Sequence, residues 1–169
     1  MLCKEGNRMR KICFLMILLI LFAAGSSFSS IAHADETVFL SKGQTLYVPA
    51  YSHIYGGNRE MPLLLAVTLS IRNTDSKHPI TITSVVYYGT KGELIKRYLD
   101  RPVVLNRFES IRYIIPQNDK SGGSGANFLV EWKSEKSVNP PIIESIMIGT
   151  QSQQGISFAS RGQVITTSN

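Results

Sequence analysis

The chain has 169 residues, with 18 basic and 12 acidic side chains and a formal net charge of +6. Four of the basic residues and one acidic residue lie within the first eleven positions, so the rest of the chain is only weakly basic. That balance argues against nucleic acid as a partner. Both cysteines, Cys3 and Cys13, also lie near the N-terminus, which leaves the remainder without a disulfide, a thiolate nucleophile or a cysteine metal ligand.

The first 34 residues have the pattern of a secretory signal peptide. Arg8, Arg10 and Lys11 stand directly before the apolar run Ile12–Ala24. The run has 13 residues, whereas a membrane-spanning helix needs roughly 20, so retention as a membrane anchor is the weaker alternative. Met9 is an alternative start of the natural product, and nothing downstream depends on that choice.

The small residues of Ala32-His33-Ala34 fit the site that a signal peptidase reads. We therefore predict cleavage after Ala34, which exports residues 35–169 to the periplasm or the outside of the cell. No cysteine follows the apolar run to accept a lipid, so we expect no stable membrane anchor after cleavage. The exported part has the length of one domain.

Hydrophobic residues along the exported part alternate with a period of two, which is typical of strands with one buried face. The clearest case is residues 63–72, where Leu65, Val67, Leu69 and Ile71 share one face. We predict no helix after residue 34. The further predicted strands are Ile80–Tyr88, Glu93–Leu99, Val103–Leu105, Ser110–Ile115, Phe128–Trp132, Ile142–Ile148 and Ile156–Ser160. The charged side chains of Glu93–Leu99 indicate an edge strand.

This pattern predicts an all-β fold, a single immunoglobulin-like β-sandwich of about seven to nine antiparallel strands, with Trp132 in its core. Closure of one sheet into a barrel is the alternative. We expect the core strands within about residues 61–150, preceded by an extended segment, 37–58, and followed by a tail, 149–169. Pro49 cannot donate a ladder hydrogen bond, so we expect Thr45–Tyr51 at a sheet edge.

The exported part resembles a bacterial family catalogued as domain of unknown function 3124. Separated motifs carry the resemblance: Tyr47–Tyr55, Leu69–Asp75, Ser121–Phe128, Gly155–Phe158 and Ser160–Gln163. It spans roughly residues 43–165. The resemblance implies an exported protein of one domain and brings no catalytic residues with it.

Candidate catalytic and metal-binding residues are few. His53 lies between Tyr51 and Tyr55, where it is either a general base or a loop histidine that packs on a tyrosine and bonds the backbone. Its potential partner His78 precedes Pro79 in a predicted turn. Two histidines without Cys pairs or an H-x-H spacing do not indicate a metal site, so we predict no metal and no cofactor.

Ser124 lies in a glycine-rich loop that approximates the G-x-S-x-G nucleophile elbow. An elbow joins a strand to a helix, whereas here the loop leads into a predicted strand. The same loop, Asn118–Gly125, lacks the helix N-terminus of a phosphate cradle and the ligand alternation of a calcium loop. We interpret it as a flexible connection.

Three tyrosines, Tyr47, Tyr51 and Tyr55, are spaced by four, which places their rings on one face of a strand. Such a face suits either an aromatic binding platform or the rim of the core. We take this segment as the candidate ligand or partner surface, with His53 between the rings. Asn58 and Arg59 are expected at its border.

These observations favour a non-catalytic binding or protein-interaction module with an unknown protein or cell-envelope ligand. The alternatives are an accessory subunit of a cell-envelope assembly and a small hydrolase that uses His53. Fold analogy carries part of this choice, and a fold by itself does not define a function.

The signal-peptide interpretation predicts that the exported product begins at Asp35. Intact-mass measurement on a periplasmic fraction checks it, because cleavage after Ala34 removes the whole apolar run. A mass that retains Ile12–Ala24 would contradict the prediction.

Overall fold

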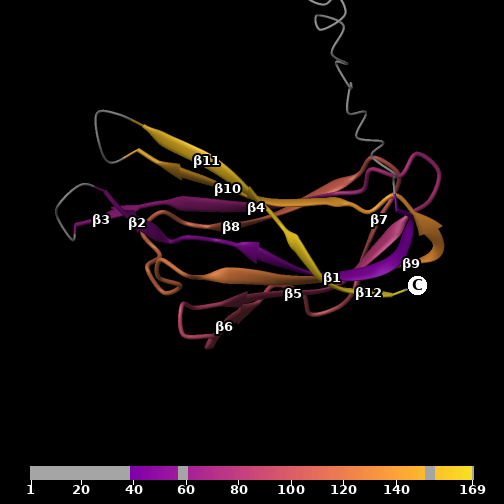
Figure 1. Ribbon diagram of the computed structural model, residues 1–169, viewed down its shortest axis with the longest axis horizontal. Coiled ribbons are helices and arrows are strands. Elements are labelled where there is room, and N and C mark those ends of the chain that lie inside the picture. The colour runs from indigo at the N-terminus through magenta and orange to yellow at the C-terminus, as the bar shows by residue number, and fades with distance from the viewer. Residues whose placement is uncertain (1–38, 57–60, 151–154, 169) are drawn as a thin grey trace, which may run out of the picture. The chain divides into compact units, whose positions relative to one another are not determined.

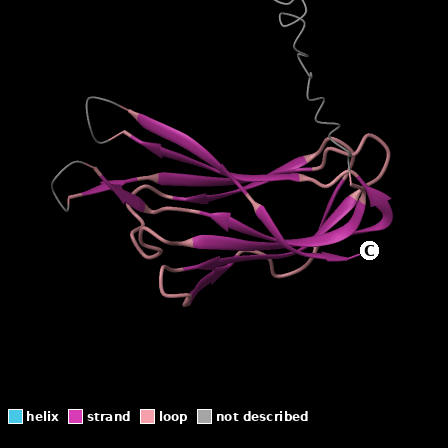
Figure 2. Ribbon diagram, in the orientation of Figure 1, coloured by secondary structure: helices cyan, strands magenta, loops and turns pink. Residues whose placement is uncertain are grey.

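The computed structural model describes residues 39–56, 61–150 and 155–168, and the predicted signal peptide lies outside these ranges. The described chain consists of strands joined by loops and turns (Figure 2). Its strands are β1 Ser41–Pro49, β2 His53–Tyr55, β3 Pro62–Leu64, β4 Ala66–Arg72, β5 Ile80–Tyr88, β6 Leu94–Arg97, β7 Val103–Leu105, β8 Ser110–Ile115, β9 Asn127–Val138, β10 Ile142–Gly149, β11 Ile156–Arg161 and β12 Gln163–Ser168. No described segment forms a helix that could cross a membrane.

The strands form two main antiparallel sheets (Figure 1). One has the order β12-β1-β9-β5-β6, with β7 also paired to β5, and the other has the order β11-β10-β4-β8. Strands β2 and β3 form a small third sheet. The predicted all-β sandwich is confirmed, with two separate sheets instead of one closed sheet, whereas the immunoglobulin-like assignment stays a prediction. Twelve described strands exceed the expected seven to nine, because both terminal segments add strands and residues 63–72 divide between β3 and β4.

The inner faces of the two sheets enclose one hydrophobic core. Strand β4 contributes Val67, Leu69 and Ile71, which are fully buried, and Leu65 directly before it is buried as well. Trp132 of β9 lies in the same core, as the sequence predicts. Alternating apolar residues therefore fix which face of each strand points inward.

Strand β1 is an inner strand, which corrects the expectation of an edge segment at Thr45–Tyr51. It pairs with β9 on one side and with β12 on the other. Pro49 is the last residue of β1, and the pairing with β12 ends two residues earlier at Tyr47. The missing N–H of Pro49 therefore interrupts no hydrogen bond of the β1–β12 ladder.

The C-terminal segment is also part of the sandwich, so the core strands extend beyond the predicted range 61–150. Strand β11 pairs with β10 in one sheet, and β12 pairs with β1 in the other, so the chain changes sheets at Gly162. The amide of Gly162 donates to the carbonyl of Ile143, 2.8 Å away. A Cβ atom at Gly162 would lie 3.1 Å from that oxygen and from Val48 Cγ2, so glycine permits this close crossing.

A buried asparagine joins the end of β4 to two neighbouring loops. The side-chain amide of Asn73 donates to the carbonyl oxygens of His78, Leu105 and Asn106 at 2.9–3.2 Å. Its backbone amide donates to the carbonyl of Glu109 at 2.9 Å. Burial makes each of these bonds expensive to lose, so the turn before β8 is held against the end of β4.

Asp75 continues this network as a buried carboxylate. Its oxygens accept hydrogen bonds from the backbone amides of Lys77 and His78 at 2.8 Å and of Asn139 at 3.1 Å. The bond from the Lys77 amide is the largest of the influences that lower the pKa of Asp75 from 3.8 to about 2. His78 Nδ1 also lies 3.3 Å from this carboxylate, so the histidine belongs to the same turn.

Because its pKa is lower in the folded state, ionised Asp75 stabilises the fold above about pH 4, and this contribution is lost as the pH falls towards 2. The change Asp75→Asn turns an N–H group towards the Asn139 amide. We expect it to lower the free energy of unfolding at pH 7 by about 1–3 kcal/mol. The difference from wild type should shrink near pH 2, and urea titrations at both pH values measure it.

The exposed residue Asp100 supplies the control, because Asp100→Asn should change stability at pH 7 by less than about 0.5 kcal/mol. Equal unfolding curves for wild type and Asp75→Asn at pH 7 would show that the carboxylate does not stabilise the turn.

Candidate functional site

The three tyrosines of the predicted binding segment have different surroundings. Tyr47 on β1 is 39% exposed and Tyr55 at the end of β2 is 57% exposed. Tyr51 is half-buried, packs against the core and has its ring centroid 6.2 Å from that of Phe158 on β11. Two of the rings therefore remain accessible, whereas the middle ring forms part of the packing between β11 and the segment after β1.

His53 is paired with one of these tyrosines. Its Nε2 atom lies 3.2 Å from the Tyr55 hydroxyl, and the two rings meet edge to face at 5.3 Å. Its Nδ1 atom is buried without a hydrogen-bond partner among the described residues. The ring thus packs on Tyr55, as one of the two interpretations expects, but it bonds the phenol and not the backbone. Asn58 and Arg59 lie outside the described residues.

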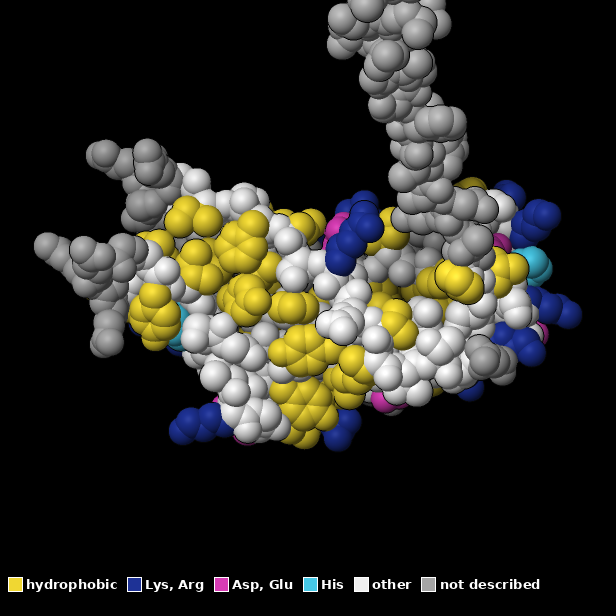
Figure 3. Space-filling view, in the orientation of Figure 1, with side chains coloured by type: hydrophobic (Ala, Val, Ile, Leu, Met, Phe, Trp, Pro, Cys, Tyr) yellow, Lys and Arg dark blue, Asp and Glu magenta, His cyan; other side chains and the backbone are white. Residues whose placement is uncertain are grey.

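Hydrophobic side chains gather between the β10–β11 hairpin and β1 on the face shown in Figure 3. Charged side chains are sparse in this part of that face (Figure 3). Within the described ranges, no three His, Cys, Asp or Glu side chains lie close enough together to hold a metal ion.

Hydrogen bonds fix the glycine-rich loop before β9 to neighbouring segments, which corrects the interpretation of this loop as a flexible connection. The carbonyl of Gly122 accepts from the amide and the hydroxyl of Thr90 at 2.9 and 2.8 Å, and the carbonyl of Gly123 accepts from the Ser52 amide at 3.0 Å. Ser124 is exposed, and the loop leads into a strand, so it lacks the strand–turn–helix context of a nucleophile elbow.

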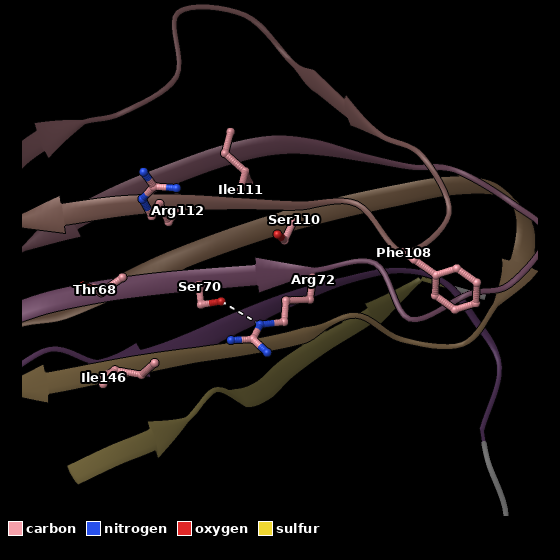
Figure 4. Close-up of a pocket in the computed structure, with 8 residues that line it drawn as sticks. All are labelled: Thr68, Ser70, Arg72, Phe108, Ser110, Ile111, Arg112 and Ile146. Carbon is pink, nitrogen blue, oxygen red and sulfur yellow. Dashed lines mark hydrogen bonds between the residues drawn. The ribbon is translucent and has the colours of Figure 1, made fainter. Parts of the chain in front are cut away.

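A second candidate site lies on the outer face of the four-stranded sheet, where an open hollow of about 430 Å³ is found (Figure 4). Its lining combines two arginines, three hydroxyl side chains, two isoleucines and one exposed aromatic ring. The lining residues are Arg72, Arg112, Thr68, Ser70, Ser110, Ile111, Ile146 and Phe108. We call this site the arginine hollow.

The arginine hollow arises from a tripeptide that occurs twice. Ser-Ile-Arg stands at 70–72 in β4 and again at 110–112 in β8, and the two strands pair antiparallel with Ile71 opposite Ile111. Each arginine therefore lies opposite the serine of the other strand: Arg72 opposite Ser110, and Arg112 opposite Ser70. Directly opposed residues have Cβ atoms about 4.5–5.5 Å apart, so the small serines leave space beside the long arginine side chains.

Arg72 is held in place within the hollow. Its Nε atom donates to the Ser70 hydroxyl at 3.0 Å, and its Nη2 atom lies 3.9 Å from Glu144 on β10. The terminal guanidinium nitrogens stay accessible, because the Arg72 side chain is 52% exposed. Arg161 on β11 lies opposite Glu144 in the same row of the sheet, so this face carries more positive than negative charge.

Phe108 lies at one end of the hollow in an unfavourable backbone conformation. It has φ = 60° and is 68% exposed. The turn is closed by a bond from the Glu109 amide to the Asn106 carbonyl at 3.0 Å, and the Asn73 network holds it in place. A left-handed conformation costs a non-glycine residue about 1–2 kcal/mol, so this turn keeps a large exposed ring where glycine would be more stable.

Sequence reasoning missed the arginine hollow. The repeated Ser-Ile-Arg was the available signal, since in each copy serine and arginine share the face opposite to a buried or half-buried isoleucine. That β4 and β8 are neighbours is a property of the sheet order and is not visible in either copy.

Comparison with known proteins supports the resemblance seen in the sequence. The family model described as "Protein of unknown function (DUF3124)" matches residues 43–165, which confirms that resemblance. No curated protein matches the chain. Among solved structures, the chain is similar to one described as "Crystal Structure of Thermotoga maritima 1070", with 12% identity and a TM-score of 0.45. The alignment covers 74% of this chain and 97% of that chain.

Packing around the predicted binding segment gives a further testable prediction. Tyr51→Ala should lower the free energy of unfolding by about 2 kcal/mol, somewhat less than truncation of a fully buried aromatic ring. Tyr55→Ala should change it by less than about 1 kcal/mol, because the ring is exposed. Urea titration of both variants checks this, and a loss for Tyr51→Ala as small as that for Tyr55→Ala would place both rings on a free surface.

Proposed function

The chain belongs to the DUF3124 family of proteins of unknown function, and we propose that it is an exported, non-catalytic binding module. In this proposal, the arginine hollow on the outer face of the four-stranded sheet holds an anionic ligand. The single observation that carries the proposal is the antiparallel pairing of the two Ser-Ile-Arg copies, which brings two arginines to one hollow.

Export is supported by the N-terminal sequence. Basic residues, an apolar run of 13 residues and Ala32-His33-Ala34 follow one another in the order of a secretory signal peptide. An exported domain without cysteines depends on its hydrophobic core and hydrogen bonds for stability, which agrees with the buried network around Asn73 and Asp75.

Anion binding is supported by the chemistry of the hollow. A guanidinium group is always charged at neutral pH and presents its donors as a planar fork that matches a carboxylate, phosphate or sulfate. Arg72 and Arg112 are diagonal neighbours on adjacent strands, and both line the hollow. Their guanidinium groups point to opposite sides, Arg72 towards β10 and Arg112 away from β4 (Figure 4), so a ligand that contacts both must span the hollow. The bond from Arg72 Nε to Ser70 orients the guanidinium before a ligand arrives, which reduces the entropy lost on binding.

The chemistry of the hollow also supports binding without catalysis. The residues that line the hollow offer hydroxyls and guanidinium groups, and none of them is a carboxylate or an imidazole that could serve as a general base. The described hydrogen-bond partner of the His53 ring is the Tyr55 phenol, which does not favour the hydrolase alternative.

Binding to poly-L-glutamate tests the proposed function directly. The mature protein from Asp35 onward should gain thermal stability with poly-L-glutamate relative to sodium chloride of equal ionic strength. The double variant Arg72→Gln/Arg112→Gln should lose most of the gain. Saturating ligand at about 100 times its Kd adds about 2.7 kcal/mol, which corresponds to a Tm increase of several degrees.

The matched control is Arg97→Gln, which removes an exposed arginine of β6 in the other sheet. It should respond to poly-L-glutamate like the wild type. If the double variant is stabilised as much as the wild type, the arginine hollow is not the anion-binding site.

A further inference from the structure

We infer that the ligand of the arginine hollow is an acidic saccharide, with sugar carboxylates on the two arginines and a sugar ring against Phe108. This inference rests on the proposed function and specifies the chemistry of its ligand. It draws on features of the hollow that anion binding alone does not require: an exposed aromatic ring, a group of hydroxyls and a central strand, β4, whose backbone groups are already paired within the sheet.

Phe108 is the first of these features. A simple anion site gains nothing from a large apolar ring beside its arginines, yet the chain keeps one at φ = 60° and 68% exposed. Strained residues persist where the surrounding structure holds them, and here the Asn73 network does so. A flat apolar partner, such as the C–H face of a sugar ring, would give this exposed ring a contact.

Hydroxyl side chains are the second feature. Thr68, Ser70 and Ser110 can each donate and accept hydrogen bonds, whereas arginine only donates. A ligand that carries hydroxyl groups matches such a lining better than a bare inorganic anion, because its own hydroxyls also donate and accept. Ile146 adds an apolar part to the same hollow.

The state of the backbone distinguishes a saccharide from an acidic peptide. Strand β4 is paired on both sides, with β10 and with β8, so its backbone donors and acceptors are used within the sheet. At the hollow, a peptide could pair its own backbone only with β8, the last strand of the four-stranded sheet, where it would lie beside Arg112 and two strand positions away from Arg72. A saccharide is bound through side chains alone. The hollow of about 430 Å³ falls within the range of small-molecule sites.

Three trimeric probes test the inference by isothermal titration calorimetry on the mature protein. Trigalacturonate has rings and charge, its methyl ester keeps the rings but removes the charge, and triglutamate keeps the charge but lacks sugar rings. We expect wild type to bind trigalacturonate at least about tenfold more tightly than either of the others, since 1.4 kcal/mol corresponds to a factor of ten.

Phe108→Gly separates the ring contact from the charge contact. Glycine adopts φ = 60° without strain, so the variant should fold with a Tm equal to or above that of wild type. We expect it to bind trigalacturonate about three- to tenfold more weakly, as for loss of one aromatic contact, and to bind triglutamate with unchanged affinity. Arg97→Gln should bind all three probes like wild type.

Two results would overturn the inference: triglutamate binding as tightly as trigalacturonate, or Phe108→Gly binding trigalacturonate like wild type. In that case, poly-L-glutamate binding that still depends on Arg72 and Arg112 would leave the proposed anion site intact. If the wild-type protein binds neither poly-L-glutamate nor trigalacturonate, the proposed function itself is contradicted.

Discussion

The hydrogen bonds of one buried side chain, Asn73, determine how the end of β4 meets the loops around it. Its amide donors face three carbonyl oxygens, and its backbone amide bonds the Glu109 carbonyl. Arg72 directly precedes Asn73, and Ser110 directly follows Glu109, so the same bonds fix the pairing of Arg72 with Ser110 at the start of the arginine hollow. They also hold the turn that presents Phe108. A buried polar group left without partners is unfavourable, so these bonds specify one arrangement of the loops.

The sandwich itself is completed by the two ends of the described chain. The Ser41 hydroxyl lies within hydrogen-bond distance of the Ser168 carbonyl, 127 positions later in the sequence. Gly162 lets the chain pass from one sheet to the other, and the Ser145 hydroxyl of β10 donates to the Pro49 carbonyl of β1. Strands that change sheets are a known way to make the corner of a sandwich. Because these contacts join distant segments, the six-stranded sheet is complete only when the C-terminal strand is in place.

Local patterns predicted much of the secondary structure. The alternation from Leu65 to Ile71 identified the inner face of β4, and the charges of Lys96 and Arg97 identified β6 as an edge strand. Local rules failed where a partner came from far along the chain. Pro49 indicated an edge for β1, but a strand from the C-terminus covers that side up to Tyr47. The glycine-rich loop was predicted to be flexible, because the sequence does not show that Thr90 and Ser52 donate hydrogen bonds to its carbonyl groups.

The sequence by itself determined the predicted leader, the all-β class, the inward face of the main strands and the turn at Asn73–Asp75. These features depend on the side-chain alternation of a strand and on residues within a few positions of each other. Only the tertiary structure decided that β4 and β8 are neighbours and that Ile71 lies opposite Ile111. The sheet order follows from burying all the apolar faces together, which no single segment encodes. Two Ser-Ile-Arg copies, each an ordinary outward-facing pair in its own strand, therefore became one site only when the sheet formed.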